Sequence, residues 1–203
     1  MTGHAALSEP EALAGLRLVV VSGLPRAGTS MLMQMLVAGG LAPFDDGRRT
    51  PDASNPRGYV EHERVRALAR DAGWLPDADG RVVKVVAPLL PHLPPGPAYD
   101  VVLVTRRLAE VLASQRAMLG RLGHAPASDA ALAPVYTRML DAARAWATAT
   151  PGARLLELDH AAVLADPADA SARLAAFLGR PLDEAAMAAA VEPSLHRERA
   201  AGA

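Results

Sequence analysis

The sequence lacks cysteine, long apolar runs and any marked excess of charge of one sign. Without cysteine, the chain forms neither disulfides nor thiolate metal sites. No apolar run reaches the roughly 18 residues of a membrane span, and residues 1–15 lack the basic start and apolar stretch of a signal peptide. We therefore expect a soluble, cytoplasmic protein without membrane insertion. A formal net charge of −1 gives no overall field for nucleic acid, so we expect no such partner.

Lysine is nearly absent too. Of the 21 lysines and arginines, only Lys84 is a lysine, and its neighbours in the run 81–86 are apolar. In a strand, its ammonium would either extend to an edge and reach water or point into a polar site. A compact ammonium contacts a single oxygen differently from a planar guanidinium, so the second alternative carries functional interest.

The chain length and apolar content are those of one domain. With 203 residues, 51% of them hydrophobic, the chain can bury one substantial core, which we expect over residues 16–203 after a loose arm at 1–15. Strand-like runs near 18–22, 81–86, 100–105 and 154–158 are separated by helical segments such as 132–146. This pattern predicts an α/β fold: a P-loop-type parallel sheet of four to five strands with helices on both faces.

A phosphate-binding loop is predicted after the first strand. The β-branched run at 18–22 breaks at Gly23, and an apolar helical segment follows from Met31. Gly23 and Gly28 have the spacing of a Walker loop, with Ser30 at the place of its hydroxyl. Thr29 stands where the Walker lysine belongs, and Arg26 is the cation of the loop. Because a triphosphate needs that lysine, the loop is expected to hold a shorter anion.

The loop resembles that of a known family. The residues Pro25-Arg26-Ala27-Gly28-Thr29-Ser30 are similar to the 5′-phosphosulfate loop of sulfotransferases, which use 3′-phosphoadenosine 5′-phosphosulfate (PAPS) as the sulfuryl donor. The resemblance implies that this loop cradles the phosphosulfate. It also implies a 3′-phosphate site, where the family has an arginine at a strand end and a serine eight residues later. Arg106 and Ser114 have that separation, and both side chains suit phosphate oxygens.

Two C-terminal segments extend the resemblance. The strand-like run 154–158, the segment 159–167 and the helix that ends at Phe177-Leu178-Gly179 are similar to a structural element of bacterial sulfotransferases. There Asp166 is expected to cap a helix that begins at Pro167. The segment 193–197 resembles a terminal Pro-Ser-Leu-x-Arg element, which makes Arg197 a candidate for the 3′-phosphate. A solvated basic tail is an equal alternative.

The resemblance gives Lys84 a catalytic role and exposes a departure. Cytosolic sulfotransferases have a lysine on the corresponding strand and a catalytic histidine two residues later, where this chain has Val86. Another group must then accept the proton, and Glu61, His62 and Glu63 are the candidates, with Glu61 first. On an extended segment Glu61 and Glu63 would share one face, whereas at a helix start acidic residues need no catalytic role.

The expected activity is therefore sulfuryl transfer from PAPS to a hydroxyl or amine of a small acceptor. Adenosine 3′,5′-bisphosphate would be released, no metal would be required, and Arg26 and Lys84 would stabilise the developing charge. Two alternatives stay open. A P-loop kinase or nucleotidase would need Mg²⁺, and a non-catalytic nucleotide-binding protein would explain the missing histidine.

Overall fold

A four-stranded parallel sheet forms the centre of the computed structural model, which describes residues 13–50, 58–125 and 127–192. The strands lie in the order β2-β1-β3-β4. Their bounds are β1 Arg17–Gly23, β2 Val82–Lys84, β3 Ala98–Thr105 and β4 Ala153–Asp159. The predicted α/β fold with a parallel sheet of four to five strands is thus confirmed.

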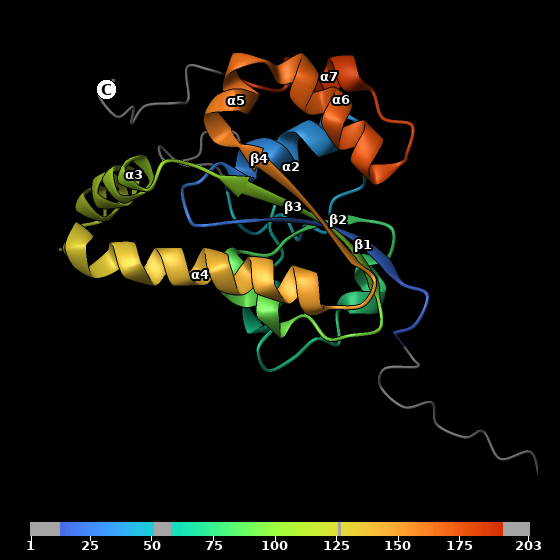
Figure 1. Ribbon diagram of the computed structural model, residues 1–203, viewed down its shortest axis with the longest axis horizontal. Helices are drawn as coiled ribbons and strands as arrows, with labels where there is room; N and C mark the ends of the chain where they lie inside the picture. Colours follow the sequence, from blue (N-terminus) through green and yellow to red (C-terminus); the bar gives the residue numbers. More distant parts are fainter. Residues whose placement is uncertain (1–12, 51–57, 126, 193–203) are drawn as a thin grey trace, which may run out of the picture.

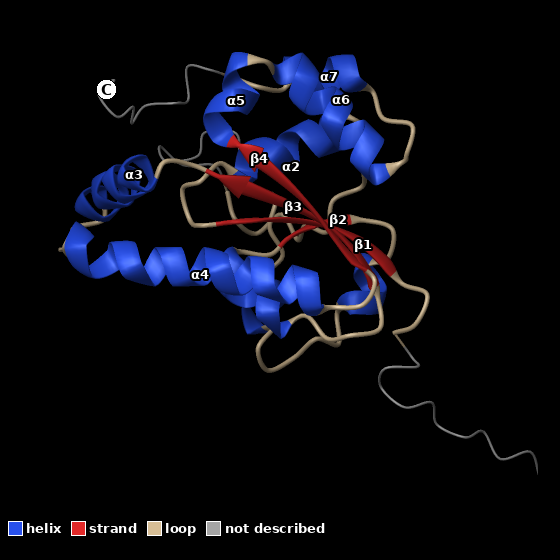
Figure 2. Ribbon diagram, in the orientation of Figure 1, coloured by secondary structure: helices blue, strands red, loops and turns tan. Residues whose placement is uncertain are grey.

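Helices cover both faces of this sheet (Figures 1 and 2). The α-helices are α2 Thr29–Ala38, α3 Leu108–Arg121, α4 Asp129–Ala149, α5 His160–Ala165, α6 Pro167–Leu178 and α7 Glu184–Ala189. Three short 3-10 helices are η1 Glu63–Ala67, η2 Leu75–Ala78 and η3 Ala87–His92. In Figure 1, α2 and α5 to α7 lie above the sheet, and α4 lies below it.

The central strand β1 is apolar from Leu18 to Val21 because both of its faces are buried there. Val19 and Val21 pack into a cluster with Met33 of α2. Leu18 and Val20 belong to a second cluster on the other face, which the 3-10 helices and the end of α4 complete. Strands buried on both faces read as continuous apolar runs, and β1 does so.

The edge strand β2 is shorter than the run 81–86 predicts. It pairs with β1 over three residues, with Lys84 opposite Val21. Pro88 lies in the first turn of η3 and has no N–H to donate to a strand partner, so the chain turns into η3 directly after Val86. Beside β2 on its free side, Phe44 donates its N–H to the carbonyl of Val82. This contact brings the segment that follows α2 to the sheet edge where Lys84 lies.

The end of β4 leads into two capped helices, α5 and α6, of which the sequence predicts the second. The Asp166 carboxylate accepts the N–H of Asp169 at 2.9 Å, Pro167 begins α6, and Gly179 ends it. Gly179 has φ of 60°, a left-handed conformation in which a side chain is strained. The predicted cap, first residue and terminating glycine of this helix are confirmed.

The helix cap gives a first prediction. Replacing Asp166 with alanine leaves the N–H of Asp169 without its acceptor and should lower the free energy of unfolding by about 1 kcal/mol, with a range of roughly 0.5–2. Urea unfolding measures this value. The matched control is Asp169→Ala in the same turn, whose exposed carboxylate lies 3.8 Å from Arg173 and should contribute less. An equal loss in both variants would contradict the capping role.

Candidate active site

The loop between β1 and α2 holds a backbone conformation that its sequence does not favour. Ala27 donates its N–H to the carbonyl of Leu24 at 3.1 Å, which closes a turn with Pro25 and Arg26 at its centre. Arg26 has φ of 70°, at a turn position where positive φ normally selects glycine. Such a conformation costs on the order of 1–3 kcal/mol and is found most often at binding and active sites.

Gly28 is required at the end of the loop for two reasons. Its φ is 114°, and a Cβ atom placed on it would lie 2.5 Å from Cδ2 of His160. His160 is the first residue of α5, directly after β4, and it is buried. The resemblance of the segment 159–167 is to a structural element, so it does not predict that His160 lies beside the loop. The signal was present, because the carboxyl ends of parallel strands meet at one edge of the sheet.

The N-terminus of α2 begins directly at the loop. Gly28 occupies the cap position and, having no side chain, makes no side-chain capping hydrogen bond. Thr29 and Ser30 begin the helix there. Uncapped N–H groups and the positive end of the helix dipole attract phosphate or sulfate groups.

Arg106 and Ser114 lie beside Arg26 at this helix end, although Arg26 is 80 or more residues away from both in the sequence. Nε of Arg26 donates to Oγ of Ser114 at 3.1 Å. Nη1 of Arg106 donates to the carbonyl of Arg26 at 3.2 Å. Arg106 directly follows the carboxyl end of β3, and Ser114 lies on α3. The structure thus joins the two elements for which the sequence predicts phosphate contacts.

Glu110 holds Arg106 in place and was not singled out from the sequence. Its Oε2 accepts from Nε of Arg106 at 2.8 Å, and both side chains are 8% exposed. The two residues are four apart at the start of α3, a spacing at which opposite charges meet on a helix, so the sequence did carry this signal. Because Glu110 holds Nε of Arg106, the guanidinium stays oriented so that Nη1 can donate to the carbonyl of Arg26 in the loop.

Lys84 points into the site. Its Nζ donates to Oγ of Ser30 at 3.0 Å and to the carbonyl of Tyr59 at 3.1 Å, and it lies 2.8 Å from Oε1 of Glu61. The side chain is only 4% exposed, so the alternative of an ammonium at a solvated edge is wrong. Burial lowers the pKa of Lys84 below its usual value, and the Glu61 carboxylate opposes this by stabilising the ammonium.

Glu61 is positioned by a strained backbone. Val60 has φ of 47°, a left-handed conformation that a β-branched residue rarely adopts. The residues before and after Val60 both contact Nζ of Lys84, Tyr59 through its carbonyl and Glu61 through its carboxylate. Arg49 donates to Glu61 at 2.6 Å, and its guanidinium lies 3.5 Å from the centre of the Tyr59 ring.

The electrostatics of Glu61 are decided by these cations. Burial raises the pKa of the carboxyl, but the charges and hydrogen bonds of Lys84 and Arg49 outweigh it, so the pKa lies below the usual value. Glu61 is therefore ionised at neutral pH. Because Lys84 and Arg49 lower its pKa, Glu61 is a weaker base as long as both of them stay in contact with it.

The neighbouring candidates His62 and Glu63 have structural partners. Nδ1 of His62 accepts the N–H of Arg64 and caps η1, and the ring stacks on Phe44 with centroids 4.2 Å apart. Glu63 lies in the first turn of η1 and pairs with Arg48. His62 keeps an extended backbone and Glu63 begins η1, so the helix-start alternative describes Glu63 but not Glu61.

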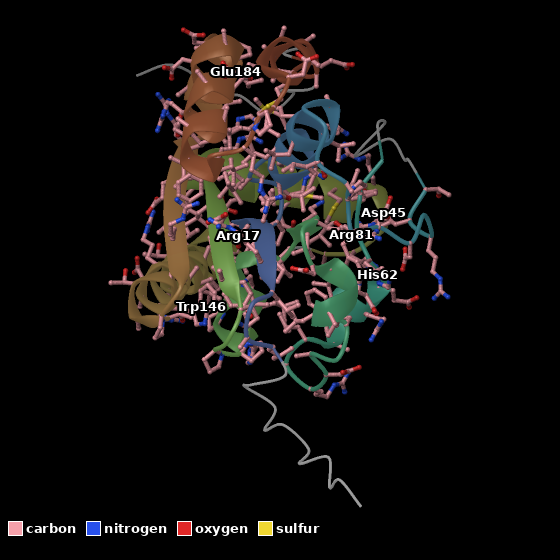
Figure 3. The ribbon with its side chains drawn as sticks, turned by 90° about the vertical axis from the view of Figure 1, so that its right-hand side faces the viewer. Arg17, Asp45, His62, Arg81, Trp146 and Glu184 are labelled. Atoms are coloured by element: carbon pink, nitrogen blue, oxygen red, sulfur yellow. The ribbon has the colours of Figure 1, made fainter. Side chains whose placement is uncertain are left out.

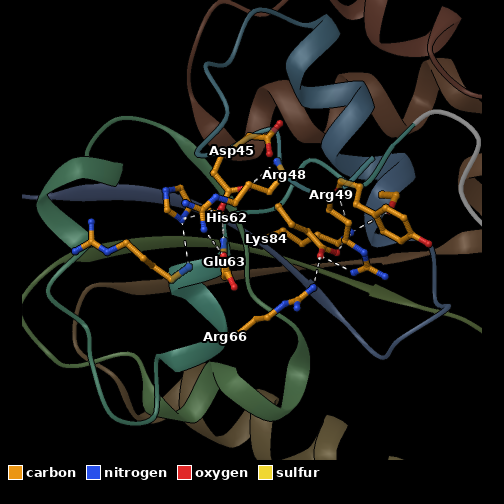
Figure 4. A network of polar contacts seen from close by, with 12 residues as sticks. Asp45, Arg48, Arg49, His62, Glu63, Arg66 and Lys84 are labelled. Atoms are coloured by element: carbon orange, nitrogen blue, oxygen red, sulfur yellow. Dashed lines mark hydrogen bonds and ion pairs between the residues drawn. The ribbon is translucent and has the colours of Figure 1, made fainter. Parts of the chain in front are cut away.

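A cleft of about 250 Å³ opens beside Glu61 (Figure 4). Its lining residues are Asp46, Arg48, Arg49, Glu61, His62, Glu63 and Arg66. From the side, Asp45 and His62 lie on one flank of the molecule, away from Glu184 on α7 and Trp146 on α4 (Figure 3). Glu61 connects the cleft to the loop, because it contacts Lys84 and Lys84 contacts Ser30.

The remaining sequence candidates give a mixed result. Val86 follows β2 and caps η3, so the histidine that the resemblance predicts has no counterpart at this position. Arg197 lies outside the described residues.

Among the described residues, no three His, Asp or Glu side chains are grouped so that they could hold a metal ion. No helix in the described part of the chain is long and apolar enough to span a bilayer.

Comparison with known proteins gives structural neighbours only. No family model matches the chain, and no curated protein does. The sulfotransferase domain from the curacin biosynthetic pathway superposes with a TM-score of 0.47 at 12% identity, covering 90% of this chain and 76% of the other. A sulfotransferase from Alicyclobacillus acidocaldarius superposes with a TM-score of 0.49 at 16% identity, covering 87% of each chain.

The third neighbour is retinol dehydratase in complex with androsterone and the inactive cofactor PAP. The superposition has a TM-score of 0.49 at 18% identity and covers 89% of this chain and 64% of the other. Two of the three are named as sulfotransferases. The likeness is one of fold, so function has to be inferred from the side chains of this chain.

The Lys84–Glu61 pair predicts a pH dependence of stability. A carboxyl whose pKa is lower in the folded state contributes stability above its unfolded pKa, near 4.5, and loses it as the pH falls through the folded value. At pH 7, Glu61→Gln should therefore lower the free energy of unfolding by about 1.5–3 kcal/mol, the range for hydrogen bonds to charged groups. This deficit should shrink below pH 4.5.

Urea unfolding of both proteins between pH 7 and pH 3.5 measures the deficit. The matched control is Glu63→Gln, whose exposed pair with Arg48 is screened by solvent and should contribute little. A deficit of Glu61→Gln that stays constant down to pH 3.5 would show that the Glu61 charge is not its source.

Proposed function

We propose that this protein transfers a sulfuryl group from PAPS to a hydroxyl or amine of a small acceptor. The observation that carries the proposal is the convergence of the glycine-capped start of α2 with Arg26, Lys84 and the pair Arg106 and Ser114, which come from three separate parts of the chain. PAPS presents anions at two ends. The chain offers cationic and hydroxyl groups to both.

The residues fit the two ends of such a donor differently. We assign the loop N–H groups, Arg26 and Lys84 to the 5′-phosphosulfate, because they surround the start of α2. Arg106 and Ser114 are assigned to the 3′-phosphate, together with Arg197 as a candidate outside the described residues. A guanidinium fork and a hydroxyl are suited to phosphate oxygens.

In the reaction, PAPS supplies the activated sulfuryl group and leaves as adenosine 3′,5′-bisphosphate. We assign to Lys84 and the loop N–H groups the stabilisation of charge on the departing phosphate. The acceptor proton passes to Glu61, the carboxylate nearest to Lys84. When the acceptor reaches Glu61, it competes with Arg49 for the carboxylate, and loss of that contact makes Glu61 a stronger base.

The contact between Ser30 and Lys84 argues against a kinase or nucleotidase. In a Walker loop the hydroxyl at this position ligates Mg²⁺. Here it accepts a hydrogen bond from an ammonium 3.0 Å away, and a divalent cation at the same oxygen would be repelled by that charge. The proposed reaction needs no metal at this place, in keeping with a donor that lacks a γ-phosphate.

Donor binding is the direct test. Adenosine 3′,5′-bisphosphate should bind at micromolar affinity without divalent metal, as measured by calorimetry. Arg106→Ala should weaken it by about 10- to 100-fold, equivalent to roughly 1.5–3 kcal/mol, and should weaken adenosine 5′-monophosphate less because that ligand lacks the 3′-phosphate.

The matched control is Arg107→Ala, an exposed arginine next to Arg106, which should leave both affinities unchanged. Equal losses for the two ligands in Arg106→Ala would mean that Arg106 acts only through the loop. Absence of binding at millimolar ligand, or tighter binding of ATP with Mg²⁺, would overturn the proposed function.

The proton acceptor has its own test. With an acceptor in hand, Glu61→Gln should lower kcat by about 10²-fold or more while the Kd for adenosine 3′,5′-bisphosphate stays within about threefold. Glu63→Gln is the control two residues away and should keep kcat near that of the wild type. If Glu63→Gln or His62→Ala loses turnover and Glu61→Gln does not, the base has been assigned to the wrong residue.

A further inference from the structure

The cleft beside Glu61 has an unusual lining. Among the residues that the structure describes, those lining it comprise three arginines, three carboxylates and one imidazole, and none has an apolar side chain. Pockets for small molecules are ordinarily lined mostly by apolar and aromatic groups. An apolar acceptor would have to strip water from these charges without replacing its hydrogen bonds, which is unfavourable.

The cleft has as many arginines as carboxylates, and its arginines already lie beside carboxylates. Arg48 pairs with Glu63, and Arg49 and Arg66 lie 2.6 and 3.9 Å from Glu61 (Figure 4). An anionic acceptor would have to compete with these carboxylates for the arginines, and a cationic acceptor would have to compete with the arginines. A neutral molecule with many hydroxyls avoids both conflicts, because each hydroxyl can donate to a carboxylate and accept from a guanidinium.

The cleft is also small and directly connected to the proposed chemistry. Its volume of about 250 Å³ lies below the roughly 300–1,000 Å³ of sites for drug-sized ligands. Glu61 lines the cleft and lies 2.8 Å from Lys84, which in turn contacts the loop through Ser30. A hydroxyl held in the cleft beside Glu61 therefore faces the element assigned to the donor.

We infer that the acceptor is a small, uncharged, polyhydroxylated molecule of the saccharide class, bound in this cleft. The inference rests on the proposed function for its chemistry. One hydroxyl oxygen forms the new bond to sulfur, its proton passes to Glu61, and the bond from sulfur to the phosphate oxygen of PAPS breaks. The product is a sulfate monoester of the saccharide.

Binding and transfer are tested separately. With adenosine 3′,5′-bisphosphate present, methyl α-D-glucopyranoside and maltose are titrated into ¹⁵N-labelled protein, alongside 4-nitrophenol, 1-butanol and glucuronate. The two neutral saccharides should shift the amide signals of residues 61–66 at lower concentration than the other three. In assays with PAPS, they should also give the higher kcat/KM, with the sulfated product identified by mass.

A paired variant tests the lining itself. Arg48→Leu combined with Glu63→Leu replaces both members of an exposed ion pair and leaves no single charge behind. It should weaken saccharide binding by at least about tenfold while leaving the Kd for adenosine 3′,5′-bisphosphate unchanged. The matched control is Arg144→Leu with Glu157→Leu, another exposed pair that does not line the cleft.

The outcomes separate this inference from the proposed function. If adenosine 3′,5′-bisphosphate binds but the phenol, the alcohol or glucuronate is preferred, or no saccharide binds, the saccharide inference is overturned and the donor assignment stands. If the saccharides bind in the cleft and no sulfate is transferred, the binding class is supported and the proposed reaction is overturned. Equal saccharide affinity in both paired variants would show that the cleft is not the site.

Discussion

The buried ammonium of Lys84 is the contact on which the site depends. It joins the edge strand β2 to the hydroxyl of Ser30 at the start of α2 and to the carbonyl of Tyr59 and the carboxylate of Glu61 on the following segment. An ammonium has three donors, and these three oxygens occupy them. Sheet edge, anion loop and cleft are thereby held at fixed distances, and a longer, planar guanidinium could not replace this geometry.

Carboxylates keep both buried cations in place. Glu61 does so for Lys84, and Glu110 does so for Arg106. A buried cation without such a partner would be strongly unfavourable, so each carboxylate stabilises the positive group beside it. The arrangement has a cost for function, because the cations that ionise Glu61 also lower its pKa and weaken it as a base.

The fold was predictable from local patterns, and the arrangement of the site was predictable only in part. The runs that became β1 and β3, the cap at Asp166 and the loop before α2 all carry short-range signals. The pair of Lys84 and Glu61 carries none, because it depends on the left-handed backbone of Val60, which no propensity favours. Such exceptions to local preference are expected where binding, rather than stability, selects the conformation.

The single lysine has a practical consequence. Since Lys84 carries the chain's only ε-amino group and is almost fully buried, amine-directed reagents have one side-chain target, and its reactivity depends on access through the site. Its lowered pKa leaves more of the reactive free amine than an exposed lysine would have at the same pH. The extent of acylation at Lys84, measured on the peptide that contains it because the α-amino group also reacts, therefore reports whether the site is open or occupied.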